Sequence, residues 1–230
     1  MLPEAILREY LSKPSTSVSA VIDFKRGVDK LVRLDLTDNN KSLDDTILSD
    51  TALFSSWIDR EIADRGGRYG IGGYNEHRAI YRRSSHFDSD DEPRRLHLGT
   101  DIWAKEGSLI YCPLNGKVHS FKFNNNFGDY GGTIILKHQF ESLGFYTLFG
   151  HLSLQSLSDL SEGKKIFSGQ KLATLGNAAE NGNWPPHLHF QLIFDLEGMR
   201  GDYPGVCKLS ESDHYLFNCP NPEIILQHTF

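Results

Sequence analysis

The sequence predicts a mainly β protein, with an all-β core preceded by an N-terminal α+β extension. From residue 108 to 194, short runs of β-branched and aromatic residues alternate with Gly or Asn, and no long helical period appears. Residues 50–64 instead carry apolar residues at helical spacing and end at Gly66-Gly67. We therefore expect an extension at residues 1–80 packed on a core at residues 81–230.

Within the extension, residues 2–12 are expected to form a short amphipathic helix. Residues 18–22 and 30–36 are expected to be strands, because they are rich in β-branched residues and alternate in polarity. The helix expected at residues 50–64 gathers several large apolar side chains on one face: Leu53, Phe54, Trp57, Ile58 and Ile62. Such a face must be buried, so the extension should pack against the core.

The glycine-rich segment at residues 66–78 lies between the extension and the core. Its spacing matches neither nucleotide-binding fingerprint and no clear strand precedes it, so we interpret it as a loop. In the alternative interpretation, Glu76, His77 and Arg78 reach a functional site of the core. Residues 84–95 are polar and acidic and are expected to form a loop leading into that site.

The core is expected to consist of short strands joined by turns. The strands are predicted at residues 108–112, 116–123, 132–138 and 145–150, with a further strand at 185–194. Residues 124–132 form a polar hairpin tip that includes Tyr130, and residues 201–205 form a turn that includes Tyr203. Outside the motifs discussed below, His119 and His138 are expected to be surface or half-buried residues.

Composition narrows the function classes. The apolar content of 39% and the charged content of 23% are ordinary for a globular protein. A net charge of -6 argues against a nucleic-acid binder, which would carry a basic patch. No apolar run approaches the ~18 residues that a membrane span needs, so no span is expected. The sequence gives no indication of the oligomeric state.

Two features favour a cytoplasmic location. The first residues contain neither a basic region nor a long apolar stretch, so they do not form a signal peptide. Cys112, Cys207 and Cys219 are odd in number and irregularly spaced, which is typical of free thiols in a reducing compartment. The alternative is an exported protein whose leader lies outside this sequence.

Four residues have the types and spacing of zinc ligands. His187 and His189 lie two apart in a predicted strand, so both rings point to one face. His97 and Asp101 would be about 13 Å apart in a regular strand. Ligands of one zinc ion lie within roughly 4 Å of each other, so the chain must turn between them, as Gly99 would allow. Alternatively, His97 and Asp101 are unrelated surface residues.

The motifs together resemble the LytM/lysostaphin-type zinc endopeptidases, peptidase family M23. The resemblance covers about residues 95–195 and preserves the family's motif order. It rests on His97-x-x-x-Asp101, the segments at 107–118, 146–153 and 169–176, and Pro186-His187-Leu188-His189-Phe190. It implies that residues 81–230 form a zinc peptidase domain, built as an antiparallel β-sheet sandwich with the metal in a groove.

The resemblance also implies the role of each residue. His97, Asp101 and His189 would bind one Zn²⁺ per chain, and His151 and His187 would be catalytic histidines that do not bind it. Zinc lowers the pKa of bound water towards about 7, and the two free histidines would orient that water, stabilise the oxyanion and protonate the leaving amine. The chain lacks a His-Glu-x-x-His helix, so a glutamate base is not expected.

The predicted substrate is a peptide amide bond, of the Gly-rich or peptidoglycan type. Tyr130, Trp184 and Tyr203 are the candidate substrate contacts, since the first and third lie in turns beside the groove. Trp184 precedes two prolines that would stiffen one wall of the groove. Two alternatives stay open: a zinc-site scaffold or binding module without turnover, and a cytoplasmic hydrolase of small amides. The sequence does not identify the bond that is cleaved.

Overall fold

An eight-stranded sheet forms the centre of the protein. The computed structural model describes residues 2–84, 87–88 and 92–230. Neighbouring strands of the sheet are antiparallel except for the first two, which are parallel. In spatial order the strands are β1 (Leu31–Leu34), β2 (Tyr69–Gly72), β4 (Thr100–Trp103), β11 (His187–Ile193), β8 (Leu143–Leu152), β7 (Gly131–Phe140), β6 (Gly116–Asn124) and β9 (Lys165–Ile166).

The central strands of this sheet are buried on both faces. Two small antiparallel sheets accompany it, one made of β5 (Leu109–Tyr111) and β10 (Lys171–Thr174), the other of β3 (Leu96–His97) and β12 (Val206–Cys207). On β7, Ile134 and Leu136 pack in one apolar cluster with Ile110 of β5, whereas Ile135 packs in another with Leu96 of β3. Because adjacent residues of a strand face opposite ways, an uninterrupted apolar run fits a strand covered on both sides.

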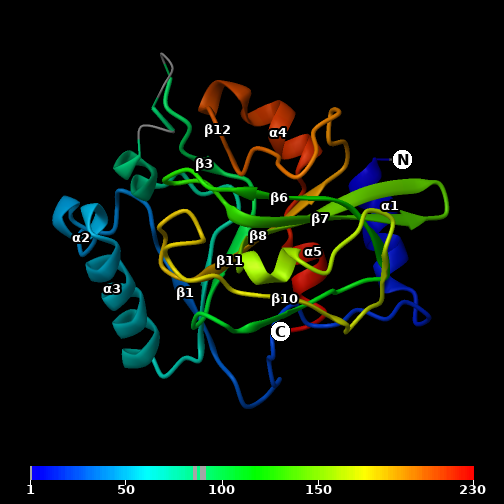
Figure 1. Ribbon diagram of the computed structural model, residues 1–230, viewed down its shortest axis with the longest axis horizontal. Coiled ribbons are helices and arrows are strands. Elements are labelled where there is room, and N and C mark those ends of the chain that lie inside the picture. The colour runs from blue at the N-terminus through cyan, green and yellow to red at the C-terminus, as the bar shows by residue number, and fades with distance from the viewer. Residues whose placement is uncertain (1, 85–86, 89–91) are drawn as a thin grey trace.

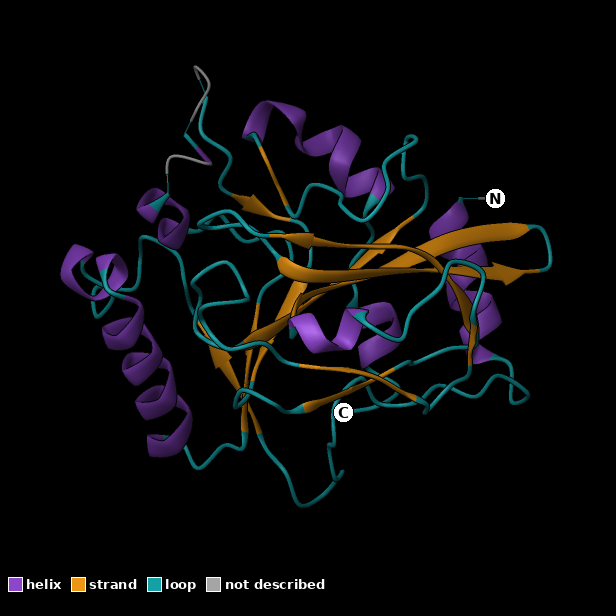
Figure 2. Cartoon of the chain, in the orientation of Figure 1, coloured by secondary structure: helices purple, strands orange, loops and turns teal. Residues whose placement is uncertain are grey.

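In the view of Figures 1 and 2 most helices lie around the outside of the sheet, whereas the short helix nearest the C-terminus lies over its middle. The helices are α1 (Pro3–Ser12), α2 (Asp45–Ser49), α3 (Thr51–Asp64), α4 (Ser212–Asn218) and α5 (Glu223–Leu226), with 3-10 turns η1 (Ala79–Arg83), η3 (Leu154–Leu157) and η4 (Leu209–Glu211). Helix α3 flanks β1 and β2, and α1 packs on the β7–β8 hairpin, where Tyr10 and Phe140 stack. Within the described residues, no helix is long and apolar enough to cross a membrane.

Helix α3 shows why this part of the chain folds as it does. The Asp50 carboxylate accepts hydrogen bonds from the amides of Ala52 and Leu53, which satisfies two donors at the helix start. Phe54, Trp57 and the other predicted face residues are buried in a cluster with Leu34 of β1 and with Trp103 of β4. Leu53 is the exception, because it remains 46% exposed.

The predicted mainly β class, with an antiparallel sheet and an N-terminal helical part, is confirmed. The strand predicted at residues 18–22 is wrong. That segment forms only an isolated bridge between Ile22 and Ile110. The amide of Ser19 does donate to the carbonyl of Pro113, but proline has no N–H to return a bond, so the ladder cannot continue.

The loop predicted at residues 66–78 is also partly wrong, because it contains β2. This strand continues the main sheet by pairing with β4, so the extension contributes two strands to it. Its glycines make room for a neighbour: a Cβ on Gly72 would lie 2.5 Å from the Trp103 ring. A four-residue strand with two glycines carries no polarity pattern, and this explains why the sequence did not reveal it.

We propose that residues 1–80 form an extension packed on residues 81–230, and limited proteolysis tests this. The backbone pairing of β2 with β4 and the burial of α3 should protect the extension. We expect no stable fragment beginning near residue 80 to accumulate while full-length protein remains. Rapid release of residues 1–80 from a persistent core, followed by mass spectrometry, would contradict the proposal.

His138 of β7 is fully buried, in contrast to the surface or half-buried position expected for it. Its Nδ1–H donates to the Asn115 carbonyl (2.9 Å), and its Nε2 accepts from the Thr147 hydroxyl (2.8 Å). Burial lowers the pKa of His138 from 6.5 to about 4. The imidazole of His138 therefore binds a proton more readily in the unfolded chain than in the folded one. Above pH 6.5 the ring is neutral in both states, so its titration does not reduce the free energy of unfolding.

Stability should be lost as the pH falls from 6.5 towards 4. The expected loss from this one group is about 3 kcal/mol of the free energy of unfolding. Urea unfolding of His138→Gln at several pH values should show a correspondingly flatter acid dependence than the wild type. His228→Gln, which changes an exposed histidine, is the control and should leave the slope unchanged. Identical slopes for the wild type and His138→Gln would contradict the assignment.

Candidate metal centre and cleft

Three strands bring the predicted metal ligands together. His97 ends β3, Asp101 lies in β4, and His189 lies in β11 directly opposite Asp101 in the sheet register. A Cβ on Gly99 would lie 2.6 Å from Cε1 of His189. A glycine is thus required at position 99 because the His189 ring passes close to its backbone. From the sequence, Gly99 was expected to allow a turn of the chain.

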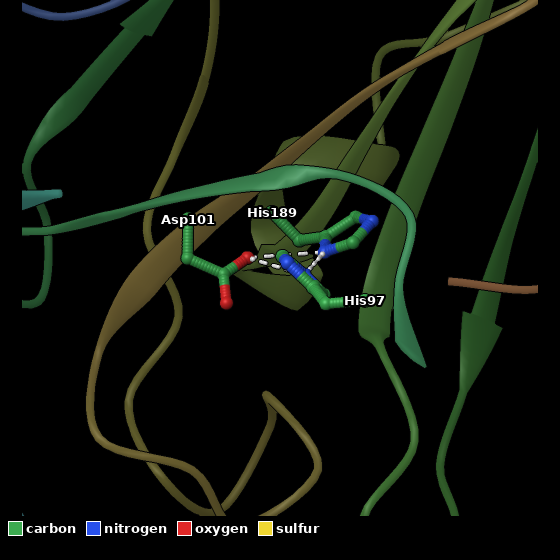
Figure 3. A group of neighbouring side chains, drawn as sticks. All are labelled: His97, Asp101 and His189. Carbon is green, nitrogen blue, oxygen red and sulfur yellow. Dashed lines mark hydrogen bonds and ion pairs between the residues drawn. The ribbon is translucent and has the colours of Figure 1, made fainter. Parts of the chain in front are cut away.

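The three side chains converge on one point (Figure 3). The distance from His97 Nε2 to His189 Nδ1 is 3.1 Å, and the distances from Asp101 Oδ1 to those atoms are 3.3 and 3.0 Å. Bonds of about 2.0 Å from a tetrahedral zinc would place its ligand atoms about 3.3 Å apart. All three residues are buried, and their donor atoms form a group with metal-ligand geometry.

In His97 and His189, the two histidines that are candidate ligands, the ring nitrogen facing away from the group already has a hydrogen-bond partner. His97 Nδ1–H donates to the Gly73 carbonyl (2.9 Å), and His189 Nε2–H donates to Oε1 of Gln191 (2.8 Å). The Gln191 amide nitrogen donates to the Pro204 carbonyl, so its oxygen faces His189. In neutral imidazoles these bonds leave the inner nitrogens without hydrogen. Two nitrogen lone pairs and a carboxylate oxygen therefore face each other, an arrangement that calls for a cation.

Electrostatics favours the protonation states that metal binding needs. Burial, reinforced by the nearby Arg78 guanidinium, lowers the pKa of His97 to about 4. For Asp101, burial alone would raise the pKa, but the charged Arg78 guanidinium beside it outweighs burial and holds the pKa well below its usual range. Neutral imidazole and ionised carboxylate are the forms that bind zinc, so His97 and Asp101 are already in the protonation states that this ion requires.

His151 and His187 lie beside this group without belonging to it. Their ring centroids are 4.1 Å apart, and His187 Nε2 lies 3.8 Å from Oδ2 of Asp101. Each Nδ1–H donates to a backbone carbonyl, that of Asn181 for His151 (2.8 Å) and that of Pro185 for His187 (2.7 Å). In each ring Nε2 is therefore the atom that can take up a proton. Burial lowers the pKa of both rings.

The backbone of His151 is strained. Its φ is 62°, in the left-handed region that residues other than glycine rarely adopt. Its amide donates to the Tyr130 carbonyl, and its carbonyl accepts from Gly176, so the surrounding chain fixes this conformation. Strain of this kind persists where neighbouring structure imposes it, and it is concentrated at functional sites.

A cleft of about 470 Å³ opens over these residues. Asp101, His151, His187 and His189 line it, together with an aromatic wall that includes Tyr81 and Phe87. The volume lies within the range of ligand pockets, roughly 300–1,000 Å³. The catalytic candidates and two of the metal-ligand candidates thus border a space large enough for part of a peptide.

The three candidate substrate contacts also line this cleft. The Tyr130 hydroxyl lies 3.4 Å from Nε2 of His189. Trp184 packs edge-on against Tyr81, with ring centroids 6.2 Å apart. The Tyr203 hydroxyl already accepts a hydrogen bond from the Asn218 amide (2.7 Å), so its polar group is occupied within the wall.

Other residues of the site lie in places that the sequence marked weakly or not at all. Of the three residues named in the alternative interpretation of the glycine-rich segment, Arg78 donates to Oδ2 of Asp101, Glu76 accepts from Arg78, and His77 is exposed. Gln191 was missed altogether. It lies two residues after His189 on the same strand face, so strand alternation could have identified it.

One comparison with known proteins covers the region that contains the site. Residues 95–200 match the family model described as peptidase family M23. The chain is similar to lipoprotein NlpD of Yersinia enterocolitica, with 30% identity over 94 residues, or 41% of this chain and 86% of that protein.

Similar solved structures include a zinc-containing peptidase from Vibrio cholerae, at 27% identity and a TM-score of 0.34, with coverage of 43% of this chain and 27% of that one. Another is the catalytic domain of lysostaphin from Staphylococcus simulans, at 18% identity and a TM-score of 0.42, with coverage of 70% and 96%. The chain spans about a third or less of the Vibrio structure and of Helicobacter pylori Csd3.

Proposed function

The chain belongs to peptidase family M23, and from this premise we propose that it is a zinc-dependent hydrolase of peptide amide bonds. The observation that carries the proposal is the convergence of His97 Nε2, Asp101 Oδ1 and His189 Nδ1, which lie 3.0 to 3.3 Å apart. Three acceptor atoms without a hydrogen among them suit one Zn²⁺ ion per chain. The same residues are our proposed ligands.

We propose that His151 and His187 are the catalytic residues. When bound, zinc supplies Lewis acidity that lowers the pKa of water and polarises a carbonyl. Nε2 of either histidine can take a proton from the attacking water, because Nδ1 keeps its hydrogen bonded to a carbonyl. The protonated ring then donates from Nε2, first to the developing oxyanion and finally to the leaving amine.

The proposed substrate is a peptide or a peptidoglycan-type amide. The cleft presents aromatic and apolar side chains beside the metal centre, and Tyr130, Trp184 and Tyr203 are its proposed substrate contacts. With its hydroxyl bonded to Asn218, Tyr203 would contribute ring surface, whereas Tyr130 can offer a hydroxyl. The net charge of -6 supports the proposal that nucleic acid is not a partner.

We propose an exported location over a cytoplasmic one. The similar protein from Yersinia enterocolitica is a lipoprotein, and this favours the exported alternative. The three cysteines are free and buried, which is compatible with either compartment. Fractionation of cells that express the native gene with a C-terminal tag should place the protein outside the cytoplasm, whereas recovery with cytoplasmic markers would restore the original expectation.

A substrate panel tests the proposed function. The purified protein should be assayed side by side on fluorogenic Gly-rich peptides, intact peptidoglycan and small amides, with and without a chelator. We expect turnover of a peptide or of peptidoglycan that the chelator abolishes and added Zn²⁺ restores. Turnover of small amides alone would indicate the small-amide hydrolase, and stoichiometric zinc without turnover would indicate a scaffold.

A further inference from the structure

The N-terminal extension forms hydrogen bonds with both the backbone and the ring of His97, one of the metal-ligand candidates. We call Gly73–Arg78, which connects β2 to η1, the outer segment. The Asn75 amide donates to the His97 carbonyl (2.9 Å), and the His97 amide donates to the Glu76 carbonyl (3.0 Å). The Gly73 carbonyl accepts from the His97 ring (2.9 Å). Three hydrogen bonds from one short segment therefore fix both the position and the rotation of His97.

The same segment reaches a second ligand candidate through Arg78. Nη1 of Arg78 donates to Oδ2 of Asp101, while Oδ1 of Asp101 faces the two histidines. The two oxygens of this carboxylate thus have different partners. An anchored Oδ2 leaves Oδ1 as the oxygen presented to a metal, which favours binding through one oxygen only.

Arg78 is itself rigidly held. Its side chain is fully buried, Nε donates to Glu76 Oε2 (2.8 Å), and the guanidinium lies over the Trp103 ring, 5.8 Å from its centroid. A buried cation is costly unless it is paired. Glu76 offsets the charge of Arg78 locally, so the negative charge of Asp101 remains available to the metal.

Room for the guanidinium is built into the adjacent strand. A Cβ on Gly72 would lie 3.0 Å from Nη2 of Arg78 and 2.5 Å from the Trp103 ring. The strand, the outer segment and the first residues of the core therefore form one packed unit around Asp101.

We propose that Arg78 is a positioning residue of the metal centre, which anchors Asp101 from the N-terminal extension and makes zinc affinity depend on that extension. The inference rests on the proposed function for the presence of zinc, and it adds that residues far outside the matched region complete the site. Its test is therefore zinc binding by the full chain, measured independently of turnover.

The first experiment compares Arg78→Ala with Arg82→Ala in the full chain. Arg82 lies four residues further on, is exposed and pairs with Asp38 at the surface, so it is the matched control. Competition with a chromogenic chelator should show zinc affinity about 10- to 100-fold weaker for Arg78→Ala, the usual effect of losing a partner of a ligand. Arg82→Ala should stay within about twofold of the wild type.

Chemical rescue separates positioning from general destabilisation. Guanidinium at low millimolar concentration should restore most of the zinc affinity of Arg78→Ala, because it can occupy the vacated space and bind Asp101. Urea at the same concentration has a similar shape but no charge and should not. The visible spectrum of the Co²⁺-loaded protein should shift in Arg78→Ala and return with guanidinium.

Arg78→Lys is the second variant, should Arg78→Ala fail to fold. A lysine ammonium can reach one carboxylate but cannot reproduce the planar fork that holds Glu76 and Asp101 together, so intermediate zinc affinity is expected. Wild-type affinity in both variants would overturn the proposal. A wild type that binds zinc but hydrolyses nothing would refute the proposed function and leave this inference standing. Variants that remain active and bind zinc with wild-type affinity would refute this inference and leave the proposed function standing.

Discussion

Replacing either His151 or His187 by alanine is expected to lower kcat by about 100-fold or more while the protein keeps its zinc. Both rings line the cleft, and both have Nδ1 committed to a backbone carbonyl. Each can therefore carry a proton on Nε2, and neither contributes an atom to the group formed by the metal-ligand candidates. Steady-state kinetics on the best peptide of the panel, together with zinc content, checks this.

The double variant sharpens the test. Because the rings lie 4.1 Å apart and would act on the same proton transfers, losing both should cost little more than losing one. His228→Ala removes an exposed histidine and is the control, with unchanged kcat expected. Wild-type turnover by His151→Ala on any substrate would refute the mechanism.

The same residues determine the pH profile. Burial lowers the pKa of both His151 and His187, so both are neutral at neutral pH and can accept a proton. As the pH falls, protonation removes that capacity, and activity should decline on an acid limb below 6.5, the ordinary imidazole value. Because the two imidazole rings lie side by side, protonation of one affects the other, so the acid limb of the pH profile reports the His151–His187 pair and not a single ring.

Two local rules, together with the resemblance to family M23, placed the centre of the predicted site, and the roles of its residues stay predictions. Strand alternation placed His187 and His189 on one face, and both lie in β11 as expected. The short spacing between His97 and Asp101 required a break in the strand, and the structure has one between β3 and β4. Periodicity also identified α3, because its buried side chains recur at helical spacing.

The surroundings of the site could not be predicted in this way. The Gly73 carbonyl bonded to His97 is a backbone atom and has no residue signature. Arg78 and Asp101 lie 23 positions apart, and nothing in the spacing indicates that a strand of the extension would pair with β4. Leu53 is exposed although the adjacent Phe54 is buried, because at 100° per residue it points past the edge of the face formed by Phe54, Ile58 and Ile62.

Replacing His189 by alanine is expected to weaken zinc binding by about 100-fold. Apparent binding free energies of about 10–16 kcal/mol for four-ligand zinc sites correspond to roughly 3 kcal/mol per ligand, or about 100-fold in affinity. His187 cannot take over, because its Nε2 lies 3.8 Å from Oδ2 of Asp101, the oxygen already bonded to Arg78, and its Nδ1 is bonded to Pro185.

Thermal unfolding with and without Zn²⁺ measures this loss without reference to turnover. A ligand present at about 1,000 times its Kd adds about 4 kcal/mol of stability, so the wild type should gain a clear increase in Tm. His189→Ala, with an affinity about 100-fold weaker, should gain only about 1.4 kcal/mol at the same Zn²⁺ concentration, whereas His151→Ala, which changes a neighbouring buried histidine, should respond as the wild type does. If His189→Ala kept stoichiometric zinc while His187→Ala lost it, the roles of these two histidines of β11 would be reversed. The geometry argues against that outcome, because His189 Nδ1 lies 3.1 Å from His97 Nε2 and 3.0 Å from Asp101 Oδ1, with its outer nitrogen fixed by Gln191.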